Sequence, residues 1–546
     1  MSFQESPNHH GNGTGQATGA SRPIESRCGA PGCLDPQLRS PNSGESLSFI
    51  RLRGAPYEQT VAGKGINPTD TLDRLAESTH YRERLELALT QRVDELAPLF
   101  TLGFHGFDKL LKSPRHLSYE QAYAAGAFIC CASNRTLHEL IGSRIPGADK
   151  GLAEPSQLKL HAISILQVLS TREALIGFHP AELAGLIAVV LELDTVTRVA
   201  SPQGQPVFAF GGMGGDRGLR LQGTNRKPFS ISTLGALALS SFGLVHKHHS
   251  YPNTSRIAGQ SAIEALGARS DFESAGALEE VLQQSSLLMS SCHNTRTIHT
   301  ISHLLKGETI NHAIGPGAIP QSSATVLNAL VGVNHNVHPA TFMAALKILN
   351  ERGVQAYGPS VGFCGIPTTK SEIPRAVLDP ERFAADPGLR ELVALDEVAP
   401  PPHTTLASFL TKSGVISVLI EPADFMPASV LHEFAPENLY IENTEEAILS
   451  ANDAALKGAD KDKVDYLAMT VALGLFCRQY ADSEEAFHQH GSEVSINRAL
   501  LQDCFLKARQ SLASGDAKRQ LESYVRATQQ SCGGLPPSSP SAPGVH

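Results

Sequence analysis

The residues best suited to chemistry begin with a glycine-rich turn that follows a short apolar run. Pro206–Phe210 is typical of a strand and leads directly into Gly211–Asp216, which reads GGMGGD. Because glycine carries no Cβ, the backbone N–H groups of such a turn can approach a phosphate closely. A tight turn without a ligand would have the same sequence, so this motif alone leaves both interpretations open.

Two further elements after this turn could bind an anion. Ser230–Thr233 (SIST) opens a predicted helix, which places hydroxyls and free N–H groups at the positive end of the helix. Lys247 belongs to the next predicted strand, Leu244–His248, and Ser255 and Arg256 precede another predicted helix. Open α/β sheets bind ligands at the edge formed by the carboxyl ends of their strands. The sequence therefore predicts one anion site at that edge.

The elements that must position these motifs indicate an α/β protein. Apolar residues recur at helical spacing over residues 70–203, where no strand pattern of comparable strength occurs. From residue 204 to 530 strands alternate with helices, and further strands are expected at 329–333, 415–420 and 355–357. We therefore expect a small N-terminal all-helical domain docked on a larger α/β domain with a central, mainly parallel sheet.

The two ends of the chain lack apolar periodicity. Residues 1–69 begin with a stretch rich in Gly, Ser, Pro, Asn and His, and residues 531–546 read SCGGLPPSSPSAPGVH. Such segments bury too little apolar surface to offset the entropy of ordering them. Both ends are therefore predicted to be disordered.

The composition excludes several classes of function. A formal net charge of −9 argues against general binding of nucleic acid or of an acidic membrane. No stretch approaches the roughly 18 apolar residues of a membrane helix, and the first 45 residues hold no secretory signal pattern. The odd number of cysteines, nine, argues against a disulfide framework. We expect a cytoplasmic protein.

The order of the motifs resembles the anthranilate phosphoribosyltransferases and their nucleoside phosphorylase relatives, a glycosyltransferase family. That family runs GTGGD, NIST, KHGN and a helix ending in EALG; this chain has GGMGGD, SIST, KHHS and EALG. The spacing from Lys247 to Gly267 matches without a gap. Residues 309–316 (TINHAIGP) resemble TIFNVLGP, and residues 395–425 resemble the family segment that begins GLDEISP and continues through a strand to TPEDF. The resemblance covers about residues 84–530 and is weakest in the helical part.

The resemblance implies a magnesium-dependent phosphoribosyltransferase that forms a homodimer. Its partners would be phosphoribosyl pyrophosphate and a small nitrogenous or aromatic acceptor. Breaking the ribosyl–pyrophosphate bond develops negative charge on the leaving group, which Mg²⁺, a cation and backbone donors can neutralise. No covalent enzyme nucleophile is required.

The resemblance also assigns roles to individual residues. It implies that the glycine turn wraps the pyrophosphate, that hydroxyls and a lysine meet the phosphates, and that an acidic pair holds Mg²⁺, an ion that prefers oxygen ligands. The expected site residues are, for catalysis, Lys247 and Asp216; for substrate, Gly212, Gly214, Gly215, Asp216, Ser230, Ser232, Thr233, Lys247, Ser250 and Arg256; and for the metal, Ser232, Asp396 and Glu397.

Two departures from the family lie on the acceptor side. Within KHHS, His249 stands where the family has glycine and Ser250 where it has asparagine. The family's pocket arginine, which faces the anthranilate carboxylate, falls on Ser302, and the nearest arginine is Arg296, six residues earlier. These changes remove contacts expected for anthranilate. The acceptor is therefore not expected to be anthranilate, although the donor elements are kept.

Two other departures add sequence. The loop Arg217–Phe229 holds 13 residues and adds basic side chains, and extra residues lie between Gly353 and Leu395. Two alternative functions stay open. A nucleoside phosphorylase would use inorganic phosphate without a metal pair, which Asp396 and Glu397 argue against. A non-catalytic paralogue would use the same cleft to bind nucleic acid or a nucleotide.

Overall fold

The computed structural model describes residues 79–132, 134–152, 157–213, 226–249, 259–270, 272, 274–292, 298, 309–491 and 493–531. The segments predicted to be disordered lie outside these residues, except Ser531. Of the residues named in the sequence analysis, the following also lie outside them: Gly214, Gly215, Asp216, Arg217, Ser250, Ser255, Arg256, Arg296 and Ser302.

The N-terminal part of the described chain is helical, as the apolar spacing predicted. Helix α6 begins with a capping box, in which the Ser118 hydroxyl accepts from the Gln121 N–H (3.2 Å) and the Ser118 N–H donates to Gln121 Oε1 (3.0 Å). The helices are α3 (Thr79–Gln91), α4 (Val93–Phe100), α5 (Gly103–Leu111), α6 (Tyr119–Cys131), α7 (Arg135–Arg144), α8 (Ala148–Gly151), α9 (Leu158–Ile176) and α10 (Pro180–Val189).

A central sheet follows, and in the described residues it has seven strands in the order β4-β3-β1-β5-β6-β7-β8. The pairs from β4 to β6 are parallel, and β7 and β8 are antiparallel additions at one edge. The strands are β1 (Val207–Gly212), β3 (Val245–His249), β4 (Leu287–Ser291), β5 (Leu327–Gly332), β6 (Ser360–Ile366), β7 (Thr404–Thr411) and β8 (Gly414–Ile420). This sheet confirms the predicted α/β class.

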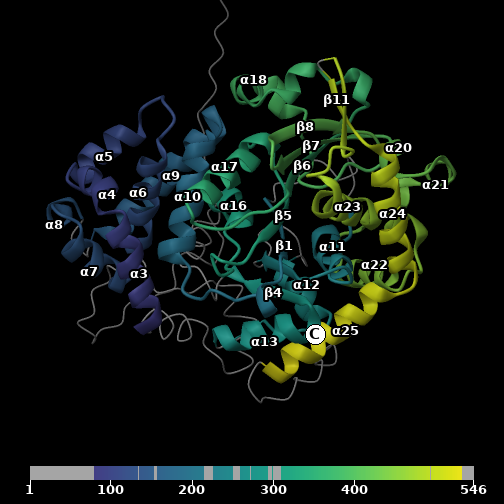
Figure 1. Cartoon of the computed structure of the whole chain (residues 1–546), viewed down its shortest axis with the longest axis horizontal. Helices are drawn as coiled ribbons and strands as arrows, with labels where there is room; N and C mark the ends of the chain where they lie inside the picture. The colour runs from purple at the N-terminus through teal and green to yellow at the C-terminus, as the bar shows by residue number, and fades with distance from the viewer. Residues whose placement is uncertain are drawn as a thin grey trace, which may run out of the picture. The chain divides into compact units, whose positions relative to one another are not determined.

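Helices cover both faces of the sheet (Figure 1). On one face Gly362 of β6 approaches Met343 of α17, and on the other Leu330 of β5 approaches Gly474 of α23. Burial on both faces explains why most strands are apolar at successive positions. The main helices are α11 (Ile231–Leu239), α12 (Gly259–Ala265), α13 (Ala275–Ser285), α17 (Pro339–Glu351), α22 (Glu445–Leu456), α23 (Lys461–Tyr480), α24 (Arg498–Ala513) and α25 (Asp516–Ser531). Within the described residues, no helix is both long and apolar enough to cross a bilayer.

The expected strand at 355–357 is wrong. Tyr357 forms only an isolated bridge with Leu327. The Gln355 side chain donates to the carbonyl of Thr325 (2.8 Å), so it fastens the segment to a loop instead of leaving it in a ladder. Strands β4, β6 and β7 were not predicted, because their apolar residues are interrupted by Ser, Thr and Gly.

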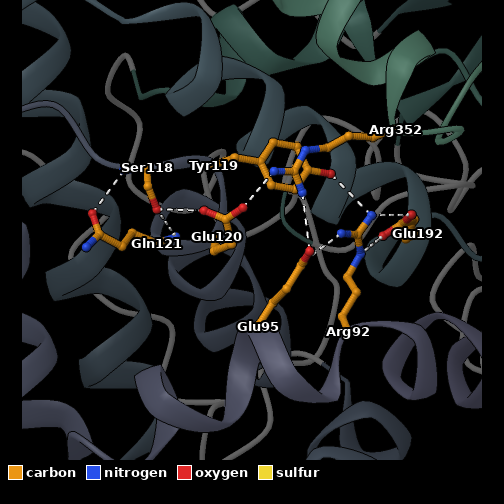
Figure 2. A network of polar contacts seen from close by, with 8 residues as sticks. All are labelled: Arg92, Glu95, Ser118, Tyr119, Glu120, Gln121, Glu192 and Arg352. Carbon is orange, nitrogen blue, oxygen red and sulfur yellow. Dashed lines mark hydrogen bonds and ion pairs between the residues drawn. The ribbon is translucent and has the colours of Figure 1, made fainter.

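An arginine at the end of α17 joins the sheet region to the helical region, where α10 packs against α17. Figure 2 shows Arg352 reaching Glu95 (3.3 Å) and Glu120 (2.7 Å), with its guanidinium carbon 3.8 Å from the centre of the Tyr119 ring. Arg92 donates to the same Glu95 carboxylate (3.0 Å). These contacts bind α17 to α4 and α6.

Part of the extra sequence before Leu395 makes a second connection. It contains α18 (Pro380–Ala385) and α19 (Pro387–Glu391). Arg390 of α19 donates to the carbonyl of Ala174 (2.9 Å), near the end of α9. A cation at a helix C-terminus is favourable because the unpaired carbonyls carry partial negative charge.

Candidate functional site

The carboxyl ends of β1 and β5 form the floor of the candidate site. Gly212 ends β1 and lies opposite Gly332, which ends β5. Asp396 lies over both glycines: a Cβ at Gly212 would be 3.0 Å from Asp396 Oδ2, and a Cβ at Gly332 would be 1.7 Å from the Asp396 carbonyl oxygen. The two glycines therefore leave the room that Asp396 occupies. Gly332 is not among the expected site residues, because the sequence of residues 329–333 indicates only a strand.

Lys247 adds a cation beside this acidic residue. It lies opposite Phe210 of β1, and its Nζ is 5.1 Å from the centre of the Phe210 ring. Burial lowers the pKa of Lys247 to about 8, while the negative charges of Glu397 and Asp396 oppose that decrease. The structure therefore brings three of the expected residues, Lys247, Asp396 and Glu397, within electrostatic reach of one another.

The start of α11 supplies the expected hydroxyls. The helix begins at Ile231, so Ser232 and Thr233 lie in its first turn, where backbone N–H groups have no partner inside the helix. Thr233 is buried and Ser232 is half-buried. One turn later, a Cβ at Gly235 would lie 3.4 Å from the Phe210 ring, so α11 packs against the strand that carries the glycine turn.

Ser230 is held in place by a residue that sequence reasoning missed. Asn452 of α22 accepts a hydrogen bond from the Ser230 N–H (3.1 Å) and donates one to the Ser230 hydroxyl oxygen (3.1 Å). Asn452 is fully buried, and no local pattern marks it, because it lies 222 residues further along the chain. Ser230 keeps its own O–H free to donate, which is compatible with its expected role at the phosphate site.

One basic residue of the long loop has an acidic partner within the protein. Arg226 lies in β2 (Arg226–Pro228), which pairs with β9 (Tyr440–Glu442). Its Nε is 3.5 Å from Glu442 Oε1, and both side chains are exposed. This pairing accounts for one of the added charges without a ligand.

The donor atoms at the site fit Mg²⁺. The resemblance assigns the metal to Asp396, Glu397 and Ser232, which offer carboxylate and hydroxyl oxygens, the ligands that this ion prefers. Asp396 is 8% exposed and therefore more buried than a residue of an open cleft. In the part of the chain that the structure describes, no group of three or more His, Cys, Asp or Glu side chains could hold a metal alone. Mg²⁺ usually takes one or two carboxylates from a protein when substrate phosphates complete its shell, so the pair of Asp396 and Glu397 is sufficient.

Solved structures of similar fold are anthranilate phosphoribosyltransferases. The enzyme from Thermus thermophilus superposes with a TM-score of 0.51 and 19% identity, over 78% of this chain and 99% of its own. The enzyme from Saccharomyces cerevisiae, solved in complex with phosphoribosyl pyrophosphate and Mg, gives a TM-score of 0.51 and 17% identity over 78% and 98%. The fold is that of the anthranilate phosphoribosyltransferases.

Sequence comparison points to the same family at a greater distance. An anthranilate phosphoribosyltransferase from Beijerinckia indica is 27% identical over 190 residues. The match covers 34% of this chain and about half, 52%, of that enzyme. No family model matches the chain. Together with the fold, this relative confirms the predicted resemblance to the anthranilate phosphoribosyltransferases.

Proposed function

We propose that the protein transfers the phosphoribosyl group of phosphoribosyl pyrophosphate, with Mg²⁺, to a nitrogenous or aromatic acceptor other than anthranilate. The observation that carries the proposal is the placement of Asp396 over Gly212 and Gly332, with the Lys247 ammonium in the field of Asp396 and Glu397. The yeast enzyme of the same fold, solved with phosphoribosyl pyrophosphate and Mg, supports the choice of donor and metal.

The residues of this chain divide the chemical work as follows. Lys247 and the first-turn N–H groups of α11 neutralise the charge that develops on the leaving pyrophosphate. Asp396 and Glu397, with the Ser232 hydroxyl, would hold Mg²⁺, which when bound adds positive charge at the phosphates. The expected contributions of the glycine turn, with Asp216, and of Arg256 belong to the same proposal.

The acceptor is proposed from the residues that replace the family's anthranilate contacts. Ser250 and Ser302 offer short hydroxyls where the family has an amide and a guanidinium. A hydroxyl cannot make the bidentate, charge-assisted contact that a guanidinium makes with a carboxylate. We therefore infer an acceptor without the anthranilate carboxylate in that position.

The proposal also covers the organisation of the protein. We propose a helical domain over 70–203, an α/β domain over 204–530, a homodimer and a cytoplasmic location.

A nucleoside phosphorylase accounts less well for the carboxylate pair beside Lys247, because phosphorolysis needs no metal. A non-catalytic binder of nucleotide or nucleic acid leaves the same pair without a role.

Calorimetry with phosphoribosyl pyrophosphate, with and without Mg²⁺, tests this function. We expect binding that requires Mg²⁺, and a Kd at least tenfold weaker in the double variant Asp396→Asn/Glu397→Gln, because a neutral pair cannot hold the ion. The exposed pair Glu484→Gln/Glu485→Gln removes the same charge elsewhere and serves as the control. If the wild-type protein shows no binding with Mg²⁺ present, the proposal is wrong.

A further inference from the structure

Two of the buried histidines that the structure describes have hydrogen-bond partners at both ring nitrogens. His246 of β3 has both ring nitrogens engaged: Nε2 lies 2.6 Å from Ser290 Oγ, and Nδ1 lies 2.8 Å from Gln321 Nε2. His338 is similar, because Nε2 reaches the Val377 carbonyl (2.8 Å) and Nδ1 accepts the N–H of Ala340 (3.0 Å). These two histidines are structural, since the protein itself replaces the water that they lose on burial.

His249, at the end of the same strand, is different. It is 6% exposed, and neither Nδ1 nor Nε2 has a hydrogen-bond partner among the residues that the structure describes. Among the buried histidines that the structure describes, it is the one in which both ring nitrogens are unpartnered. Carbonyls of Met289 and Gly259 lie near enough to influence the ring but not in hydrogen-bond geometry. Burying such a group without a partner is unfavourable, so the ring is suited to a partner that arrives from outside the chain.

The position of His249 indicates what that partner is. Side chains alternate along a strand, so His249 lies on the same face of β3 as Lys247, two residues earlier. That face packs against α11, whose start carries Ser232 and Thr233. Burial and the charge of Lys247 together lower the pKa of His249 to about 3. The ring is thus a neutral imidazole with one N–H to donate, next to the cation of the donor site.

We propose that His249 contacts the substrate directly, donating its N–H to an anionic oxygen of phosphoribosyl pyrophosphate. The inference rests on the proposed function and deepens it. The family carries glycine here, so this contact would be specific to the present chain. A neutral donor suits the place, because it adds a hydrogen bond to the phosphates without a second charge beside Lys247.

The test is the Kd for phosphoribosyl pyrophosphate with Mg²⁺, measured together with the melting temperature. In His249→Leu we expect a Kd ten- to a hundredfold weaker, the range for losing a hydrogen bond to a charged group. The melting temperature should stay equal or rise, because two unpartnered nitrogens are removed. If His249 had only a structural role, His249→Leu would lower the melting temperature and leave the Kd unchanged. His249→Gln, which keeps an N–H donor, should recover part of the affinity.

The controls separate this inference from the function on which it rests. If His249→Leu does not fold, His249→Gly, with the residue of the family, replaces it in the same measurement. A variant lacking the imidazole that binds within twofold of the wild type overturns the role of His249 and leaves the proposed function standing. A wild-type protein that fails to bind phosphoribosyl pyrophosphate overturns both.

Discussion

Replacing Gly332 by alanine should displace Asp396 and so disable the candidate site. The added methyl would lie 1.7 Å from the carbonyl oxygen of Asp396 and 2.8 Å from its carbonyl carbon. Real Cβ atoms essentially never approach other heavy atoms closer than 3.0 Å, so the backbone of Asp396 must retreat by more than about 1 Å. A flexible side-chain end could swing aside, but this neighbour is backbone.

The magnitude follows from that displacement. A misplacement of about 1 Å in a positioned group costs on the order of a hundredfold in rate, or about 2.7 kcal/mol. Overpacking in a well-packed strand also lowers the free energy of unfolding by roughly 1–3 kcal/mol. We therefore expect Gly332→Ala to lose both turnover and Mg²⁺-dependent donor binding, and to melt at a lower temperature.

The assay compares three glycine variants by calorimetry with phosphoribosyl pyrophosphate and by thermal melting. Gly276→Ala is the control, since its Cβ would meet only Ser274 Oγ at 3.8 Å, and alanine favours the helix by up to about 1 kcal/mol. Gly212→Ala should be intermediate, because its neighbour at 3.0 Å is the movable carboxylate of Asp396. A Gly332→Ala protein with wild-type binding and melting would refute the placement of Asp396.

Two further predictions concern the acceptor and the junction of the helical and sheet regions. With Ser250 and Ser302 at the acceptor positions, anthranilate should bind ten- to a hundredfold more weakly than a carboxylate matched by arginine. Steady-state kinetics at saturating donor and Mg²⁺ will measure this weaker binding as a raised KM for anthranilate. Efficient turnover at micromolar anthranilate would contradict the prediction. Arg352→Ala should lower the free energy of unfolding by about 1–2 kcal/mol, from one cation–π contact with Tyr119 and two half-exposed ion pairs. Chemical denaturation measures this loss, and an unchanged value would show that the junction is held by other contacts.

The strands and the helix that carry the donor half of the candidate site could be predicted because their signals are local. A strand, a glycine turn and a helix start follow one another in sequence, and each is recognised by its own residues. Strand β1 was expected at Pro206–Phe210 and forms at Val207–Gly212, and β3 was expected at Leu244–His248 and forms at Val245–His249. The family resemblance then identified Asp396 and Glu397, which no local pattern distinguishes from a surface acidic pair.

The features of the candidate site that the sequence did not predict depend on contacts between residues far apart in the chain. The close approach of Gly332 to Asp396 follows from tertiary packing, as does the pairing of Asn452 with Ser230. A glycine inside a strand predicts close approach in general but does not say what approaches. The unpartnered ring of His249 is likewise visible only once its neighbours are in place.

The departures from the family form two groups with different physical roles. Arg390 of the extra sequence donates to the Ala174 carbonyl at the end of α9, so this insertion serves to hold the helical region. Arg226 of the long loop pairs with Glu442, so that charge is matched within the protein. By contrast, His249 has no hydrogen-bond partner within the described part of the chain. Divergence in the first group changes how the fold is held, and divergence in the second places a buried, unpartnered ring beside Lys247. The change at His249 is thus the one to test for a change of substrate contacts.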